Sequence, residues 1–264
     1  MEQKTSDNNG KDAVKILDKS ICLLKKIATD QTQKKTSITG LSKELGVSRS
    51  TMYRILDTLL AHRILMKDEA SGQYSLGWNL CFLGNAAQRS NSLYMVLHPI
   101  LVKLSDEFEE TVSISVLDEG EGLVIDTIRG SLNNPLVVDV YLGVHEPLHT
   151  TAYGKALLLD HSEAELAETL GGQSLPVHAS GTLRTVSALH DQIQTARKLG
   201  YTIAVDEFDE GVSALACPVR DFSRSLVAAV SLATPTVRMT PDNIARFSGK
   251  LISIAREMSE ALGF

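Results

Sequence analysis

Two short amphipathic helices joined by a glycine turn, in residues 38–61, constrain the fold of this chain more than any other feature of its sequence. Apolar residues recur at helical spacing from Ile38 to Leu45, and Gly46 then follows as a residue that ends helices in a left-handed conformation. Ser48 is a good N-cap for a second helix that begins at Arg49. The pattern predicts a helix-turn-helix, a motif whose second helix enters the major groove of DNA.

Segments on either side extend this pair to a winged helix-turn-helix. Val14–Ala28 has apolar residues at three- and four-residue spacing and is expected to form a helix, which a polar break at Thr29–Thr36 separates from the next one. After the second helix, Ile64–Lys67 and Gln73–Leu76 are expected to form two strands. The tip between them, Asp68–Gly72, is polar and ends in glycine, as the turn of a wing requires.

The predicted recognition helix presents hydrogen-bond donors where a core helix would present apolar side chains. Met52 is the one apolar residue of its first two turns. Base edges and phosphates are recognised by such donors, and a helix N-terminus also favours phosphate. We expect DNA contacts from Ser48, Arg49, Ser50, Thr51, Tyr53 and Arg54 on this helix and from Lys67 on the wing. The competing interpretation is that these side chains only solvate an exposed helix.

Charge is divided unequally along the chain. The whole sequence carries a formal net charge of -6, yet residues 1–77 hold 13 Lys and Arg against 9 Asp and Glu, whereas residues 78–264 hold 13 against 23. A basic first part and an acidic remainder suit a protein of which one end meets phosphate.

Features of other protein classes are weak in this sequence. No apolar stretch approaches the roughly 18–20 residues that a bilayer span needs, and Met1 to Lys11 do not follow the pattern of a secretory signal. We therefore expect a soluble, cytoplasmic protein with no membrane association. Cys22, Cys81 and Cys217 are too widely separated for a disulfide framework or a paired metal site, and we interpret all three as small buried hydrophobic residues.

The remaining two thirds of the chain mix strand and helix patterns. Residues 78–108 indicate two helices, the first of which would link two domains. Further strands are predicted at Val112–Leu117, Leu123–Ile128, Leu136–Leu142, Tyr201–Val205, Ser213–Val219 and Leu226–Leu232, and helices at Ala152–Leu159, Ser162–Leu170, Val186–Leu199 and Asp242–Leu262. The turn Asp118–Gly122 is typical of a hairpin. Runs of strands with helices on one face suggest an α+β sandwich.

Residues that could carry catalysis or hold a metal are few. His145 and His149 have the spacing of two metal ligands on a helix, but Pro147 between them disfavours a helix there. The acidic run Asp206, Glu207, Asp209 and Glu210 is expected to be solvated surface rather than acid–base machinery. No metal or cofactor is expected, and no Ser-His-Asp order, phosphate loop or metal set indicates an enzyme.

Lys155 lies near the start of a predicted helix, where a cation is unfavourable. A nearby carboxylate such as Glu207 is expected to compensate it, which would be a structural role.

Three stretches of the chain resemble, in the same order, the IclR family of bacterial regulators. Thr39–Gly77 is similar to the DNA-binding domain of that family, residues 147–156 to its PLHxTAxGKA segment, and residues 200–219 to its second signature. The resemblance runs from about Val14 to Phe264 and also takes in Ala228–Ser231, Pro235, Arg238 and Thr240. It implies a GAF-like C-terminal domain that binds an organic effector and relays its presence to the DNA-binding domain.

The resemblance also maps an effector pocket onto this chain. It assigns to the lining Ala152, Tyr153, Ala204, Ala214, Ser231 and Ala233. We expect Gly154, Val138 and Leu142 to line the same space. Where small-acid sensors of the family carry Asp, Cys and Ser, this chain has three alanines, so Ser231 is left as the main side-chain hydroxyl. Such a pocket implies an effector that is larger or more apolar than glyoxylate or pyruvate.

The carboxylate of that effector is expected to meet backbone amides. Thr150 or Thr151 can cap the helix that begins near Ala152, and small residues there leave room for a carboxylate to approach. An ordinary capped helix with nothing bound is the competing interpretation.

The sequence thus predicts an α+β protein with a winged helix-turn-helix in residues 13–77, a linker helix in 78–92 and a GAF-like effector-binding domain in 93–264, after a disordered segment in 1–12. Its expected function is to bind double-stranded operator DNA, as a homodimer or a dimer of dimers, and to repress transcription under control of a small organic, carboxylate-containing effector. The alternatives are a small-molecule enzyme with an appended DNA-binding domain and a nonspecific DNA-associated scaffold.

Overall fold

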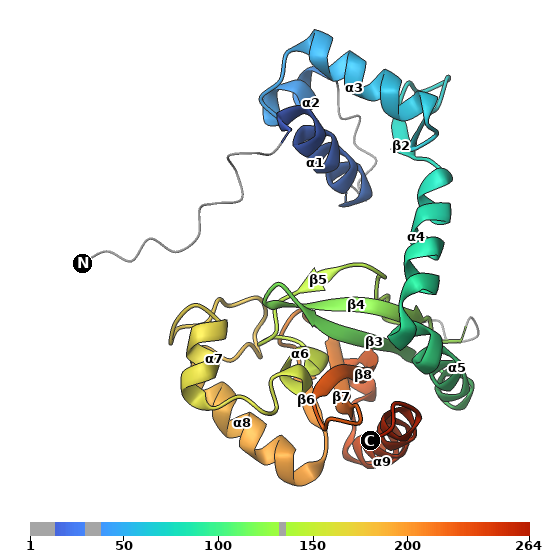
Figure 1. The fold of residues 1–264 in the computed structure, drawn as a ribbon. Helices are drawn as coiled ribbons and strands as arrows, with labels where there is room; N and C mark the ends of the chain where they lie inside the picture. Colours follow the sequence, from blue (N-terminus) through green and yellow to red (C-terminus); the bar gives the residue numbers. More distant parts are fainter. Residues whose placement is uncertain (1–13, 30–37, 132–135) are drawn as a thin grey trace. The chain divides into compact units, whose positions relative to one another are not determined.

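The computed structural model describes residues 14–29, 38–131 and 136–264, and the chain divides into two compact units, Met1–Ser90 and Asn91–Phe264 (Figure 1). The segment expected to be disordered, 1–12, and residues 30–36 of the expected polar break lie outside the described residues. The assignment of residues 78–92 as a linker stays a prediction.

The first unit is a winged helix-turn-helix. Its elements are α1 (Lys15–Thr29), α2 (Ile38–Glu44), α3 (Arg49–Ala61), β1 (Leu65–Lys67) and β2 (Tyr74–Leu76), and the two strands pair antiparallel. Gly46 adopts a φ of 64° between α2 and α3, a conformation that glycine accepts without steric strain. A small core joins the elements and consists of Leu23, Leu41, Met52, Ile55, Leu56 and Leu65. The expected helix-turn-helix and wing are confirmed.

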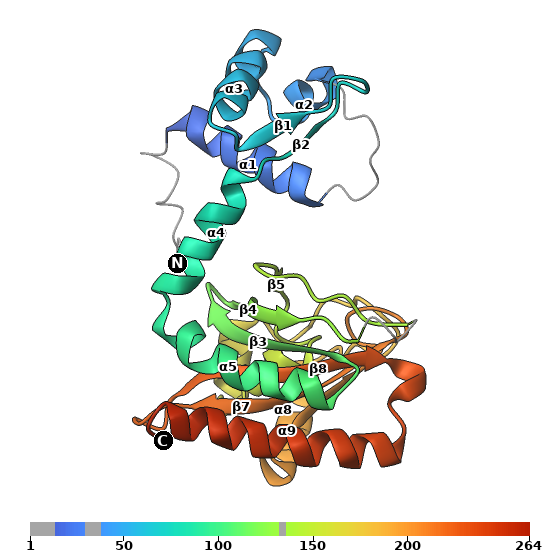
Figure 2. The same ribbon diagram turned by 90° about the vertical axis from the view of Figure 1, so that its right-hand side faces the viewer.

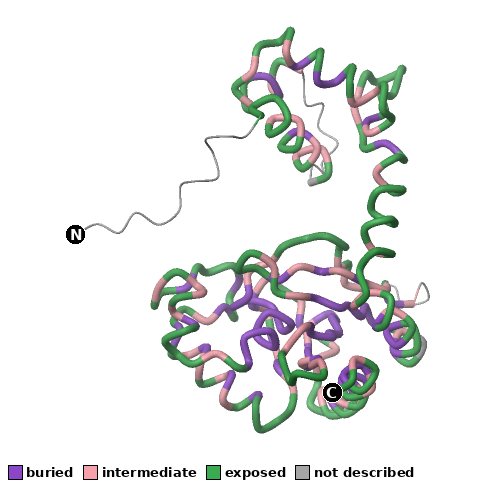
Figure 3. Tube along the Cα trace, in the orientation of Figure 1, coloured by how far each residue is buried: buried purple, intermediate pink, exposed green. Residues whose placement is uncertain are grey.

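Asn91 separates α4 (Asn79–Ser90) from α5 (Ser92–Glu107). Its backbone is extended, and its side-chain oxygen accepts hydrogen bonds from the amides of Leu93 at 3.0 Å and Tyr94 at 3.3 Å. These bonds satisfy amides that have no partner within the new helix, so the chain ends one helix and starts another here. No residue of α4 is buried, as the tube in Figure 3 shows.

A six-stranded antiparallel sheet forms the centre of the second unit, in the order β5-β4-β3-β8-β7-β6. The strands are β3 (Thr111–Asp118), β4 (Glu121–Ile128), β5 (His145–Glu146), β6 (Thr202–Val205), β7 (Val212–Arg220) and β8 (Leu226–Pro235). Successive side chains of a strand point to opposite faces, so the central strands contribute to two separate cores.

Helices cover both faces of this sheet. On one face α5 and α9 (Pro241–Ala261) pack against branched residues such as Ile114, Leu215 and Val230 (Figure 2). On the other face α6 (Ala152–Leu157), α7 (Glu163–Thr169) and α8 (Val186–Leu199) share a core with small residues, among them Ala216 and Ala229. The α+β class is confirmed, but the expectation of helices on one face only is wrong, because the central strands are apolar on both sides.

Residues 136–142 do not form the strand that was expected of them. Side chains take the carbonyl groups that a sheet partner would have used: the Thr111 hydroxyl donates to the carbonyl oxygen of Val138 at 2.6 Å, and the Arg238 guanidinium donates to that of Leu136. The edge strand next to β4 is instead the short β5, in which Glu146 pairs with Gly122. Alternating apolar residues alone therefore gave a false strand signal.

Two of the three cysteines differ from expectation. Cys217 is buried, but Cys22 and Cys81 are exposed. Both lie on helices of the first unit, each on a side of its helix that faces solvent.

Candidate DNA-binding surface and ligand cavity

The N-terminus of α3 is built by Ser48. Its hydroxyl oxygen accepts a hydrogen bond from the Thr51 amide at 3.1 Å and lies 3.0 Å from the Ser50 hydroxyl and 2.8 Å from the Thr51 hydroxyl. An N-cap of this kind fixes where the helix begins and therefore which side chains lie in its first turn.

The face of α3 opposite the core is polar and accessible. Met52, Ile55 and Leu56 point into the core, which leaves Arg49, Ser50, Tyr53 and Arg54 exposed and Thr51 half-buried. Among the described residues, neither Arg49 nor Arg54 has an ion-pair partner. Both guanidinium groups are therefore accessible to a phosphate or a base edge.

The wing ends in a turn that is fixed by Asp68. Its carboxylate accepts hydrogen bonds from the amide of Ser71 at 2.6 Å and from the hydroxyl of the same residue at 2.9 Å, and these bonds lower the pKa of the Asp68 carboxyl. Lys67, the residue proposed for DNA contact on the wing, is exposed beside this turn at the end of β1.

A cavity of about 80 Å³ lies on the α6 side of the sheet in the second unit. Its floor follows from strand register, because Ala204, Ala214 and Ala233 stand directly opposite one another across β6, β7 and β8. Beside them the hydroxyls of Ser113 on β3 and Ser231 on β8 lie 2.7 Å apart. The side chains of these alanines and serines are too short to fill the space between the sheet and the elements that cover this face. A cavity therefore remains between the two layers.

Most residues that the sequence assigned to the pocket line this cavity. They are Val138, Ala152, Tyr153, Ala204, Ala214, Ser231 and Ala233. Leu142 is exposed and lies outside the lining, because the segment that carries it is not a strand. Gly154 is also outside it: a Cβ atom there would come within 2.3 Å of the Leu148 carbonyl oxygen, so glycine serves close backbone packing.

Sequence reasoning missed about half of the lining. The additional residues are Ser113, Asp139, Val140, Glu146, Thr150, Thr151, Phe208, Asp209 and Val212. Ser113 carried a usable signal, as a polar residue between Val112 and Ile114 in a strand that is otherwise apolar. Glu146 and Asp209 carried none, because their positions depend on an edge strand and a loop whose geometry the sequence pattern does not specify.

Glu146 and Tyr153 form the main polar contact of the cavity wall. The Tyr153 hydroxyl donates to Glu146 Oε2 at 2.5 Å, and its ring lies against Gly122, where a Cβ atom would come within 2.5 Å of ring carbon Cε2. Burial raises the pKa of the Glu146 carboxyl, and the nearby charge of Asp209 raises it further, although the Tyr153 hydrogen bond opposes both.

Thr151 is the residue that caps α6. Its hydroxyl oxygen accepts from the Gly154 amide at 3.1 Å, which confirms the expectation of a threonine cap at this helix.

The compensation expected for Lys155 is also confirmed. Its ammonium group lies 2.6 Å from Glu207 Oε1 and also donates to Gln192 and to the carbonyl oxygen of Ile203. The two charged side chains are only 1% and 4% exposed. Burial lowers the pKa of Lys155 and raises that of Glu207, and each charge counteracts the shift of the other. Glu207 is thus not the solvated acid that the sequence suggested.

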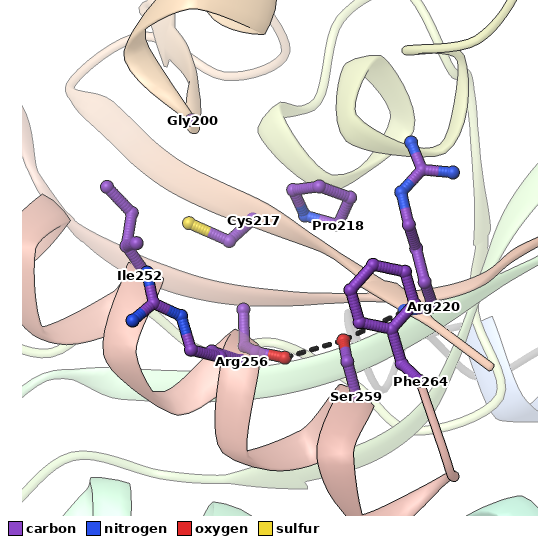
Figure 4. A pocket seen from close by; sticks show the side chains of 9 residues that line it. Gly200, Cys217, Pro218, Arg220, Ile252, Arg256, Ser259 and Phe264 are labelled. Carbon is purple, nitrogen blue, oxygen red and sulfur yellow. Dashed lines mark hydrogen bonds between the residues drawn. The ribbon is translucent and has the colours of Figure 1, made fainter. Parts of the chain in front are cut away.

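A second cavity, of about 220 Å³, lies between β7 and α9 (Figure 4). Cys217 and Pro218 form its floor and Phe264 lies over one side, while Ser259 donates to the carbonyl oxygen of Ala255. Burial raises the pKa of the Cys217 thiol to about 12, which disfavours the reactive thiolate. None of the site residues expected from the sequence lines this cavity.

Histidines 145 and 149 do not come together. His145 lies 2.8 Å from an oxygen of Asp118, whereas His149 lies 2.9 Å from the carbonyl oxygen of Pro176. Across the part of the chain that the structure describes, no three histidine, cysteine or carboxylate residues are grouped as a metal site would require. No described helix has the length and apolar character needed to cross a bilayer.

Two family models match this chain. The model described as "IclR helix-turn-helix domain" matches residues 17–69, and the model described as "Bacterial transcriptional regulator IclR C-terminal" matches residues 86–260. The two matches follow the division of the chain into a helix-turn-helix unit and a cavity-bearing unit.

Curated proteins and solved structures agree with these matches. The HTH-type transcriptional regulator XynR of Escherichia coli is 32% identical over 86% of this chain and 89% of its own length, and the transcriptional repressor IclR of the same species is 28% identical over 95% and 90%. The crystal structure of Thermotoga maritima IclR is 26% identical, with a TM-score of 0.76 over 94% of this chain and 98% of that one.

Proposed function

The chain belongs to the IclR family of bacterial transcriptional regulators, and from this membership we propose that it binds operator DNA through α3 and the wing, represses transcription, and responds to a small organic effector in the cavity over β6, β7 and β8. One observation carries the proposal: an exposed donor face on α3 and a cavity with a floor of small residues occur in the same chain. We also propose a cytoplasmic site of action, which suits a protein that binds chromosomal DNA in a bacterium.

The DNA-binding part of the proposal rests on the chemistry of α3. Arg49 and Arg54 offer charged donors and Ser50, Thr51 and Tyr53 neutral ones, while the Ser48 cap sets the start of the helix. Lys67 on the wing adds a cation that suits a phosphate. Repression is proposed because the relatives named transcriptional repressor IclR and repressor AllR match this chain over most of their length.

Exposed apolar side chains in the first unit support a homodimer. Val14, Leu17 and Ile21 are exposed on or beside α1, and Trp78 and Phe82 at the start of α4 are 76% and 73% exposed. Large apolar side chains exposed to this degree are typical of an interaction surface. A homodimer, alone or paired as a dimer of dimers, presents two recognition helices to a palindromic operator.

The cavity is proposed as the effector site because small residues keep it open on an otherwise packed sheet face. Effector binding can alter DNA affinity only if the two protein states bind the effector with different affinities. The carboxylate expected in the effector would meet no lysine, arginine or histidine among the lining residues. The enzyme alternative gains no support, because the named relatives are transcriptional regulators.

A gel-shift titration tests the proposal. Wild-type protein and the variant Ala152→Trp are titrated against the DNA upstream of the gene at fixed salt, with and without candidate metabolites. We expect one metabolite to shift the wild-type DNA affinity and to have no effect on Ala152→Trp, because the indole fills the cavity. The exposed position Ala164 on α7 gives a matched control, Ala164→Trp, in which the response is retained.

Ala152 is fully buried, and a tryptophan at such a position can prevent folding, so a smaller substitution is tested as well. Ala214→Leu adds volume at a half-buried position of the floor and is expected to abolish the response in the same way. A metabolite response that persists in both folded variants would place the effector site elsewhere. Failure of the wild-type protein to bind its upstream DNA specifically would contradict the proposal that it is a transcriptional regulator.

A further inference from the structure

We propose that the effector is a compact compound that donates hydrogen bonds and carries no net negative charge, an amine or an alcohol with an apolar body, and that Glu146 is its acceptor. This inference rests on the proposed function of the cavity over β6, β7 and β8. It replaces the expectation of a carboxylate with a ligand class that the lining side chains select.

The charges of the lining all have one sign. Its charged residues are Asp139, Glu146 and Asp209, and it contains no lysine, arginine or histidine. Asp139 is paired with Arg129 at 2.6 Å, so its charge is compensated. Glu146 and Asp209 have no cationic partner within the described residues. An anionic ligand would add a further negative charge to this site, whereas an amine would supply the missing counter-charge.

Most hydroxyl groups that line the cavity already donate their hydrogen to another protein group. Tyr153 donates its hydrogen to Glu146, and Thr150 and Thr151 donate theirs to the carbonyl oxygen of Pro147 at 3.2 and 3.4 Å. Between Ser113 and Ser231, one hydroxyl must donate to the other. What these side chains still offer to a ligand is therefore mainly oxygen lone pairs, which a ligand N–H or O–H can use and a carboxylate cannot.

Glu146 has an oxygen available for this contact. Oε2 accepts the Tyr153 hydrogen, while Oε1 has no hydrogen-bond partner among the described residues. The side chain is half-buried at the cavity wall, and burial together with Asp209 raises the pKa of its carboxyl. A donor from the ligand, above all a cationic one, relieves this unfavourable ionisation.

The rest of the lining sets the size and character of the ligand body. Val138, Val140, Phe208 and Val212 supply apolar surface above the alanine floor. A volume of about 80 Å³ admits only a compact group. One ring or a short branched chain with a single donor-bearing arm is complementary to such a site.

Three probes of similar size separate the possibilities: benzylamine, benzyl alcohol and benzoate, each titrated calorimetrically into the full-length protein. We expect benzylamine and benzyl alcohol to bind at least about tenfold more tightly than benzoate, since a hydrogen bond to a charged group is typically worth more than this ratio. In Glu146→Gln, benzylamine is expected to lose about tenfold in affinity while benzyl alcohol changes much less. Glu121→Gln, an exposed carboxylate of β4, is the matched control and should leave all three affinities unchanged.

The possible results distinguish this inference from the function on which it rests. Benzoate binding more tightly than benzylamine, with that binding abolished in Ala214→Leu, would overturn the ligand class and leave the effector cavity in place. Binding of the probes that is unaffected by Ala214→Leu would contradict the cavity itself. Failure of all three probes to bind would also overturn the inference. Asp209→Asn, in an exposed loop, repeats the charge test if Glu146→Gln does not fold.

Discussion

At the scale of single residues, Arg49 and Arg54 carry the DNA-binding proposal. Arg49→Ala or Arg54→Ala is expected to weaken operator binding by about 1–3 kcal/mol if the arginine reads a base, and to leave fold and effector binding unchanged. An arginine that contacts phosphate would instead weaken binding to all sequences and lower the slope of the salt dependence by about one. Fluorescence anisotropy with operator and scrambled duplexes at several salt concentrations separates the two cases.

The control for this experiment is Arg89→Ala, which removes an exposed arginine from α4 rather than from α3. Operator affinity equal to wild type in both α3 variants would show that α3 is not the recognition helix.

Single residues also show which parts of the cavity lining could be predicted from the sequence. Ala204, Ala214 and Ser231 could be predicted, because a family motif carries them and strand register then places them on one face. Glu146 could not, since it enters the cavity wall through a two-residue strand that pairs only with Gly122 and Leu123 on β4. Residues of regular elements inherit their orientation from periodicity, whereas residues at edges and in loops depend on long-range contacts.

At the scale of secondary-structure elements, α6 is held in place by the buried pair Lys155–Glu207. Lys155→Met is expected to destabilise the protein by about 3–5 kcal/mol, because it leaves the Glu207 charge buried without a partner. Adding Glu207→Leu should recover part of this loss, since an apolar pair removes the uncompensated charge. Urea denaturation of the single and double variants measures both effects.

An exposed pair on the opposite face provides the comparison. Lys103 and Glu257 join α5 to α9 at 2.8 Å, and Lys103→Met is expected to change stability by less than about 1 kcal/mol. Equal losses in Lys155→Met and Lys103→Met would refute the role assigned to the buried pair.

Helices and strands could be predicted where the apolar residues of a segment followed a single regular spacing. The expected helix Val186–Leu199 has the observed bounds of α8, because Thr185 caps its start and Gly200, at a φ of 81°, ends it. The expected strand at 136–142 was wrong, since Thr111 and Arg238 bind its carbonyl groups and keep it out of the sheet. The local sequence pattern predicts whether a segment tends to form a β-strand, but not whether a neighbouring strand is available to pair with it.

At the scale of the whole molecule, assembly should depend on the exposed apolar residues of the first unit. The double variant Trp78→Glu with Phe82→Glu is expected to shift the protein from dimer to monomer, because the interface would bury four carboxylates, two from each copy, in place of indole and phenyl rings. Analytical ultracentrifugation at micromolar concentration measures the shift, and operator affinity should fall with it.

Phe222→Glu is a control of the same kind, because Phe222 is 78% exposed on the second unit. A dimer that persists in the double variant, or a wild-type protein that is already monomeric with and without DNA, would contradict this assembly.

Residues 136–141 form one wall of the cavity, and their irregular structure affects how the ligand preference can change in evolution. This segment contributes Val138, Asp139 and Val140 to the lining, yet it takes no part in the sheet and is fastened by side chains of Thr111 and Arg238. A change in a central strand disturbs neighbours on both sides, whereas an irregular surface segment tolerates substitution, insertion and deletion. Under the proposed function, descendants of this chain could therefore acquire a new effector by mutation in one short stretch, while the sheet and α3 stay unchanged.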